Sequence, residues 1–168
     1  ESGFNVVPTS SMGRLFDAVA AIAGVRQRIT YEAQAAIEFE ALADAGVEDA
    51  YAFAITGDTP AIVEPGPVVR ALVDDVRRGA PVGVVSAKFH NAVANLVLEL
   101  SLRTREREGI ETIALTGGVF QNVTLLCPTV TRLTKAGFGV LTHSAVPPND
   151  GGLALGQAMV SAAQYAQR

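Results

Sequence analysis

The chain has 168 residues, 49% of them apolar and 18% charged, which is enough to form a hydrophobic core and excludes a disordered segment. The formal net charge is −4 and basic residues cluster only at 103–107, so we expect no nucleic acid as a partner. No apolar stretch approaches the length of a membrane span, so we also expect no membrane contact.

Cysteine usage limits the chemistry further. Cys127 is the only cysteine, which excludes an intrachain disulfide and a four-cysteine zinc site and favours a reducing compartment, the cytoplasm. It precedes Pro128 in a helical segment, where we expect it to be buried and inert. The sequence starts at Glu1 and enters patterned sequence almost at once, so we expect a piece of a longer protein.

The first half of the chain is predicted to contain two helices and a hairpin. Apolar residues recur at helical spacing over 12–22 and again over 31–45. Two short β-like runs, 51–55 and 60–63, flank residues 56–59 (TGDT), a sequence typical of a hairpin turn.

Helices dominate the rest of the chain. They are expected over 68–77, over 81–108 with a proline in the first turn, and over 152–166 at the end of the chain. Together with the first half, this pattern predicts an α/β fold with more helix than strand.

A strand–helix–strand unit lies between these helices. Strands are predicted at 110–115 and 138–141, with a helix at 123–136 between them, which makes the two strands parallel. The sheet has so few members for a chain of this length that we expect its missing strands to lie upstream of Glu1.

Each of the two strands is followed by a turn rich in glycine. Gly117 and Gly118 follow the first strand, and Asp150 stands before two glycines after the second. The carboxyl ends of parallel strands meet at one edge of the sheet, where α/β proteins bind ligands. Paired glycines let a backbone approach a phosphate or ribose, and the start of the following helix favours anions. This pattern predicts a nucleotide site.

Simpler interpretations of the polar residues at these turns stay open. Asn122 has an amide that suits a ribose or a base edge, but it is equally typical of a helix cap. Asp150 is typical either of a metal ligand or of a cap.

Five segments stand out because they follow one another in the order of a known family. They are 9–21 (TSSMGRLFDAVAA), 30–36 (TYEAQAA), 88–91 (KFHN), 116–122 (TGGVFQN) and 148–158 (PNDGGLALGQA). In this order they resemble the HypF-type hydrogenase-maturation carbamoyltransferases, over nearly the whole chain. The chain is similar to the C-terminal part of those proteins, in the domain related to the tRNA threonylcarbamoyl-transfer enzymes.

The resemblance implies a fold and an activity. The fold is an incomplete ribonuclease-H-like lobe of an actin-like ATPase (ASKHA) fold, with residues 1–168 forming a single domain, chiefly the second lobe. The whole family protein is expected to make carbamoyl-adenylate from carbamoyl phosphate and ATP. It then passes the carbamoyl group to the C-terminal cysteine of a partner, HypE, where it becomes a cyanide ligand of [NiFe]-hydrogenase.

The resemblance also implies roles for particular residues. Gly117, Gly118 and Asn122 match nucleotide contacts, as do Asp17, expected at the ribose, and Glu32. Asp150 matches a carboxylate ligand of a divalent metal (Zn, Fe or Mg). No catalytic residue within the chain is implied.

The chain departs from the family pattern in three ways. Ala33 stands where the family commonly has glycine, and Thr116 where it commonly has serine, and we expect little effect from either. The paired metal histidines of the family lie upstream, so the isolated chain is expected to be inactive and metal-free. Two other functions stay open: an O-carbamoyltransferase of antibiotic biosynthesis, and a docking lobe without nucleotide.

Overall fold

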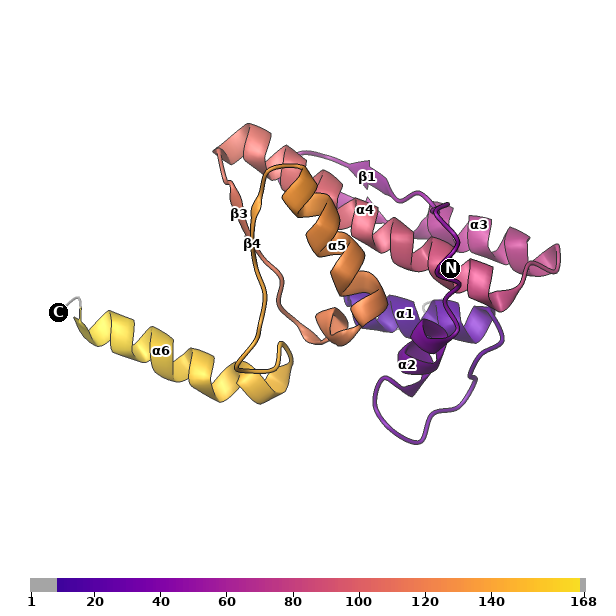
Figure 1. Cartoon of the computed structure of the whole chain (residues 1–168), viewed down its shortest axis with the longest axis horizontal. Helices are drawn as coiled ribbons and strands as arrows, with labels where there is room; N and C mark the ends of the chain where they lie inside the picture. Colours follow the sequence, from indigo (N-terminus) through magenta and orange to yellow (C-terminus); the bar gives the residue numbers. More distant parts are fainter. Residues whose placement is uncertain (1–8, 167–168) are drawn as a thin grey trace, which may run out of the picture.

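The computed structural model describes residues 9–166 (Figure 1). It opens with helix α1 (Met12–Ile22), at the predicted bounds. Ser11 caps this helix by accepting a hydrogen bond from the Arg14 amide, and Phe16, Val19 and Ala20 face the core.

Helix α2 (Gln34–Ala41) is shorter than the predicted 31–45 at both ends. Ala33, just before the helix, has a left-handed backbone (φ 59°, ψ 11°). A right-handed helix cannot include a residue in this conformation, so α2 starts after Ala33. Beyond its end, the Asp44 amide donates to the carbonyl of Gly83, which is distant in the sequence. This amide is therefore not bonded within α2, and the helix ends before it.

The predicted hairpin is confirmed. Strand β1 (Ala54–Thr56) pairs antiparallel with β2 (Ile62–Glu64), with Ile55 opposite Val63. Arg107 donates to the carbonyl of Asp58, which ties the hairpin tip to the end of a long helix.

Two helices begin directly after prolines, the second at the proline expected in its first turn and the first two residues before the predicted 68. Helix α3 (Gly66–Arg77) begins after Pro65, and α4 (Val82–Glu108) begins after Pro81. Helix α4 is the central helix of the fold, because α2, α3 and α5 (Val123–Lys135) all pack against it (Figure 1).

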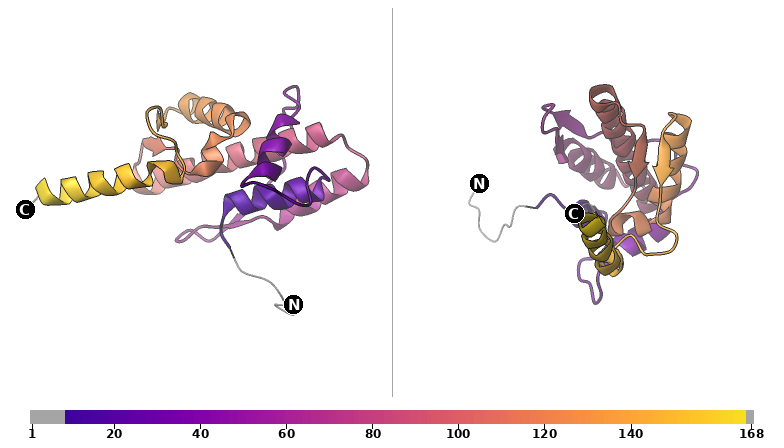
Figure 2. Two further views of the ribbon diagram at one scale, coloured as in Figure 1. Left: turned by 90° about the horizontal axis from the view of Figure 1, so that it is seen from below. Right: turned by 90° about the vertical axis from the view of Figure 1, so that its left-hand side faces the viewer.

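The parallel strand–helix–strand unit is also confirmed. Strand β3 (Thr112–Ala114) pairs in parallel with β4 (Gly139–Leu141), and α5 connects them after a short 3-10 turn, η1 (Gly118–Gln121). A second such turn, η2 (Asp150–Gly152), leads into α6 (Leu153–Ala166). Helix α6 projects away from the remaining helices (Figure 2), and every residue along it is exposed.

The buried side chains form two clusters. The larger lies where α1, α2 and α4 meet, and its aromatic centre includes Phe16 and Phe89, which pack edge to face at 4.8 Å. Such a pair contributes about 1 kcal/mol beyond its area burial. The smaller cluster, around Leu115, Leu133 and Phe138, packs the β3–β4 pair against α4 and α5.

The prediction that Cys127 is buried is wrong, because the structure exposes it. Helix α5 buries Leu125, Thr129 and Leu133, which recur every fourth residue. Cys127 lies about 200° around the helix from Leu125, on the opposite face. Among the described helices, none combines the length and the apolar character needed to cross a membrane.

Candidate nucleotide site

The two glycine turns lie side by side, as predicted. The Leu115 amide donates to the carbonyl of Leu141 at 2.9 Å, and the Gly117 amide donates to the carbonyl of Pro148 at 2.8 Å. Between the turns and the start of α6 is a cavity of about 570 Å³. Its lining includes three of the predicted site residues, Gly117, Gly118 and Asp150.

Glycine is required at two places around this cavity. Gly117 has φ 99° and ψ 153°, a backbone conformation that other residues rarely adopt. A Cβ on Gly152 would lie only 2.7 Å from the carbonyl oxygen of Pro147. The glycines therefore shape the cavity before any ligand is considered.

Two backbone amides of the first turn are available to a ligand. Within residues 9–166, the N–H groups of Gly118 and Val119 donate to no acceptor. They start a helical turn, where unpaired N–H groups point outward and favour an anion. A phosphate oxygen is the kind of group that fits them.

At the start of helix α5, in contrast, side chains already accept hydrogen bonds from two of the amides. Asn122 caps it, with Oδ1 accepting the Leu125 amide at 2.8 Å, and Glu40 from α2 accepts the Thr124 amide at 3.1 Å. Among the described residues the Val123 amide is left without an acceptor, so the expectation that this helix start favours an anion stays a prediction. Sequence reasoning missed Glu40, because its partner lies 84 residues away.

The structure confirms that Asn122 caps a helix, while its predicted contact with the nucleotide stays a prediction. It stands just before α5, and its Nδ2 donates to Nε2 of His90 at 2.8 Å. Asn122 is partly exposed and does not line the cavity. His90 is 2% exposed, and its burial lowers its pKa below the ordinary value, so the ring is neutral.

Asp17 lies in the middle of α1. It is one turn beyond Gly13, whose face of the helix approaches Val119 of η1. Both carboxylate oxygens are buried, and neither accepts a hydrogen bond from the described residues. Arg14 approaches one of them to 2.9 Å, but without the alignment of a hydrogen bond. A buried carboxylate left in this way is costly, and a donor from a ligand, such as a hydroxyl, would satisfy it.

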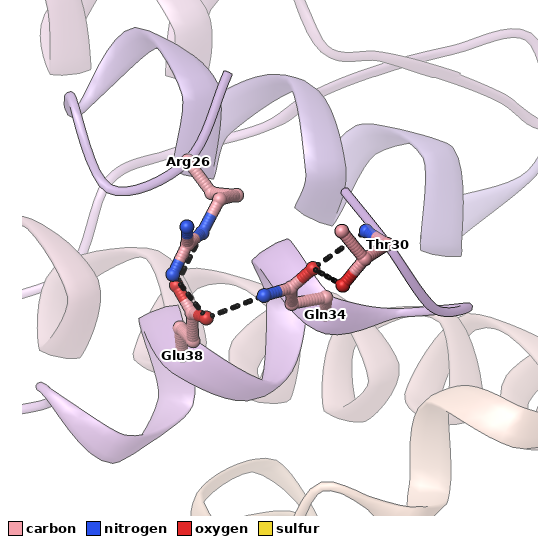
Figure 3. Close-up of polar contacts among 4 residues, drawn as sticks. All are labelled: Arg26, Thr30, Gln34 and Glu38. Atoms are coloured by element: carbon pink, nitrogen blue, oxygen red, sulfur yellow. Dashed lines mark hydrogen bonds and ion pairs between the residues drawn. The ribbon is translucent and has the colours of Figure 1, made fainter. Parts of the chain in front are cut away.

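Glu32 is exposed on the loop between α1 and α2 and does not line the cavity. Polar contacts fix this loop (Figure 3). Arg26 makes two hydrogen bonds to Glu38, at 2.8 and 2.6 Å, and Gln34 donates to Glu38 while accepting from the Thr30 amide at 2.8 Å. The loop thus presents Glu32 in a defined place.

Asp150 is exposed at the start of η2, and Asn149, not Asp150, is the capping residue. Within the described residues there is no group of three histidine, cysteine, aspartate or glutamate side chains that could hold a metal ion. His143, which also lines the cavity, bonds to Thr116 Oγ1 at 3.0 Å. The described residues therefore offer a single carboxylate arm and do not by themselves fit a divalent metal.

Known proteins resemble this chain over nearly its full length. A family model described as "Carbamoyltransferase, Kae1-like Domain, second subdomain" matches residues 1–157. Carbamoyltransferase HypF of Rhodobacter capsulatus is 40% identical over 96% of this chain and 21% of its own length. Carbamoyltransferase HypF of Synechocystis sp. is 38% identical over 94% of this chain and 20% of its own.

A solved structure agrees with these relatives. A full-length HypF in the phosphate- and nucleotide-bound form superposes with a TM-score of 0.88 at 41% identity, over 90% of this chain and 20% of that one. The chain thus spans about a fifth of the length of the relatives it matches. The match confirms the α/β fold predicted above, a lobe of the ASKHA type. The chain belongs to the HypF family of carbamoyltransferases, as the second subdomain of their Kae1-like domain.

Proposed function

We propose that this chain forms the nucleotide-binding half of a carbamoyltransferase site. In the longer protein, acting in the cytoplasm, carbamoyl phosphate is hydrolysed to carbamate and phosphate, and the carbamate reacts with ATP to give carbamoyl-adenylate and pyrophosphate. The carbamoyl group then passes to the C-terminal cysteine thiol of a HypE-type acceptor protein, on the way to the cyanide ligands of [NiFe]-hydrogenase. The isolated chain, as a single domain without the rest of the protein, is inactive.

One observation carries the proposal. The glycine turn places the unpaired amide of Gly118, followed by that of Val119, beside a cavity of about 570 Å³ that Gly118 lines, at the carboxyl edge of two parallel strands. Ligands of α/β proteins bind at that edge, and phosphates bind to such amides. A relative of the same fold crystallised with phosphate and nucleotide supports the choice of ligand.

The predicted site residues take complementary roles. The free amides of Gly118 and Val119 bond a phosphate, which Gly117 allows to come close because it has no side chain. The buried carboxylate of Asp17 accepts from the ribose, and Glu32 and Asn122 complete the nucleotide contacts. Asp150 gives one arm of a metal site whose other ligands lie elsewhere in the longer protein. No catalytic residue within the chain is proposed.

The test uses the longer polypeptide that contains this chain. Transfer of the carbamoyl group to an acceptor with a C-terminal cysteine is followed by mass spectrometry, and ATP affinity by calorimetry. Asp17→Asn is expected to weaken ATP binding, because a neutral amide accepts from a ribose hydroxyl less strongly than a carboxylate does. Little folding stability should be lost, because the partly exposed ion pair with Arg14 contributes little.

Asp150→Ala is expected to slow transfer, and Asp74→Asn, at an exposed position on α3, serves as the matched control. Wild-type protein that binds no ATP would overturn the proposal, as would Asp17→Asn and Asp150→Ala variants that both behave like the control.

A further inference from the structure

His90 is the most deeply buried polar ring of the larger core cluster. Its imidazole is 2% exposed and lies against Phe16, Phe39 and Phe89, at centroid distances of 5.2, 5.8 and 6.5 Å. An apolar side chain would fill this space at less cost, because a buried imidazole must have both nitrogens bonded. Both nitrogens of His90 are bonded.

The partners of Nδ1 fix the position of the ring proton. Nδ1 lies 2.8 Å from the carbonyl oxygen of Ser86. A carbonyl can only accept, so Nδ1 carries the proton. The Ser86 hydroxyl, 3.3 Å from Nδ1, already donates to the carbonyl of Phe39 and cannot also donate to the ring. Nε2 is therefore bare and can only accept.

The side chain of Asn122 is fixed from both ends as a result. The Leu125 amide can only donate, so it faces Oδ1, and Nδ2 then faces the bare Nε2 of His90. Turning the amide over would bring two donors together at Leu125 and two acceptors together at His90. One N–H of Nδ2 is used at His90, and the second donates to no group within residues 9–166.

We propose that His90 is a positioning residue for the nucleotide: its bare Nε2 holds Asn122 so that the second N–H of Nδ2 is presented to the bound nucleotide. The proposal rests on the assignment of Asn122 to the nucleotide site made above. His90 itself is enclosed in the core and touches no ligand, so it acts through Asn122 alone.

Two substitutions of His90 separate positioning from packing. Phenylalanine fills the space but cannot accept a hydrogen bond, whereas the Oε1 atom of glutamine can take the place of Nε2. In the longer polypeptide, His90→Phe is expected to weaken ATP binding about tenfold, the effect of one misplaced hydrogen bond, while His90→Gln stays close to wild type. Thr129→Val, which removes another buried hydrogen bond, to the Leu125 carbonyl within α5, is the control and should bind ATP normally.

The opposite order, with His90→Phe tolerated and His90→Gln damaging, would mean that His90 only packs, and would overturn the proposal. A measurement on the unsubstituted protein covers the case in which a variant fails to fold. The ¹⁵N spectrum of labelled histidine should show the neutral ring protonated at Nδ1, and a proton on Nε2 would overturn the proposal.

Asn122→Ala distinguishes this inference from the proposed function. If Asn122→Ala weakens ATP binding and His90→Phe does not, the positioning role fails and the proposed function stands. If Asn122→Ala changes nothing, the assignment of Asn122 to the nucleotide site fails and the positioning role falls with it.

Discussion

Ala33 offers a direct test of the backbone that leads into α2. It has φ 59° and ψ 11°, and no other non-glycine residue described by the structure has a positive φ. The Cβ of an alanine in this conformation costs roughly 1–2 kcal/mol. Glycine removes that cost but gives the unfolded chain more freedom, worth about 0.4–1 kcal/mol. We therefore expect Ala33→Gly to stabilise the fold by about 0.5–1 kcal/mol.

Urea and thermal unfolding measure this gain. For a chain of this size, 1 kcal/mol corresponds to a rise of about 2–4 °C in Tm. The matched control is Ala18→Gly, at an exposed position in the middle of α1, which should destabilise by about 1 kcal/mol because the backbone there is helical. If Ala33→Gly destabilises as Ala18→Gly does, the left-handed conformation is wrong.

Asp75→Asn tests a buried ion pair, and Gly152→Ala, with Gly156→Ala as its control, tests the backbone beside the cavity. Hydrogen bonds, first from Lys88, lower the pKa of Asp75 to about 2. The folded state therefore gains at most about 2 kcal/mol above pH 4, which is lost as the pH falls towards 2. Asp75→Asn should reduce this acid-dependent loss of the free energy of unfolding, as measured by urea melts at several pH values. An unchanged pH dependence would contradict the ion pair between Asp75 and Lys88. Gly152→Ala should cost about 1–3 kcal/mol, because its Cβ meets a backbone oxygen at 2.7 Å. Gly156→Ala lies in the helix α6, where a Cβ would meet open space, and should raise the free energy of unfolding by up to about 1 kcal/mol. Equal effects of the two substitutions would contradict the close contact between Gly152 and the Pro147 carbonyl.

Most of the fold could be predicted from local patterns. Helix α1, the hairpin and the parallel unit depend on periodicity and on turn residues that lie next to each other in sequence. The ends of α2 could not be predicted, because one depends on the strained backbone of Ala33 and the other on a contact with Gly83.

The candidate site was predictable to the same extent. Gly117, Gly118 and Asp150 share a cavity because parallel strands end at one edge, which the sequence pattern indicates. The bonds from Glu40 to α5 and from Asn122 to His90 join residues 84 and 32 positions apart. Only packing brings such pairs together, so no spacing in the sequence could reveal them.

The central claim is that a nucleotide packs against the glycine turn of η1. Gly118→Ala tests it, because the new Cβ would lie 3.7 Å from Asn149 Cβ, an ordinary contact, and so should leave the fold intact. The same Cβ stands beside the Gly118 and Val119 amides and should prevent the close approach of a phosphate. ATP titration of the longer polypeptide should show affinity reduced at least about tenfold, or about 1.4 kcal/mol, with Tm almost unchanged. Wild-type affinity in Gly118→Ala would contradict the account.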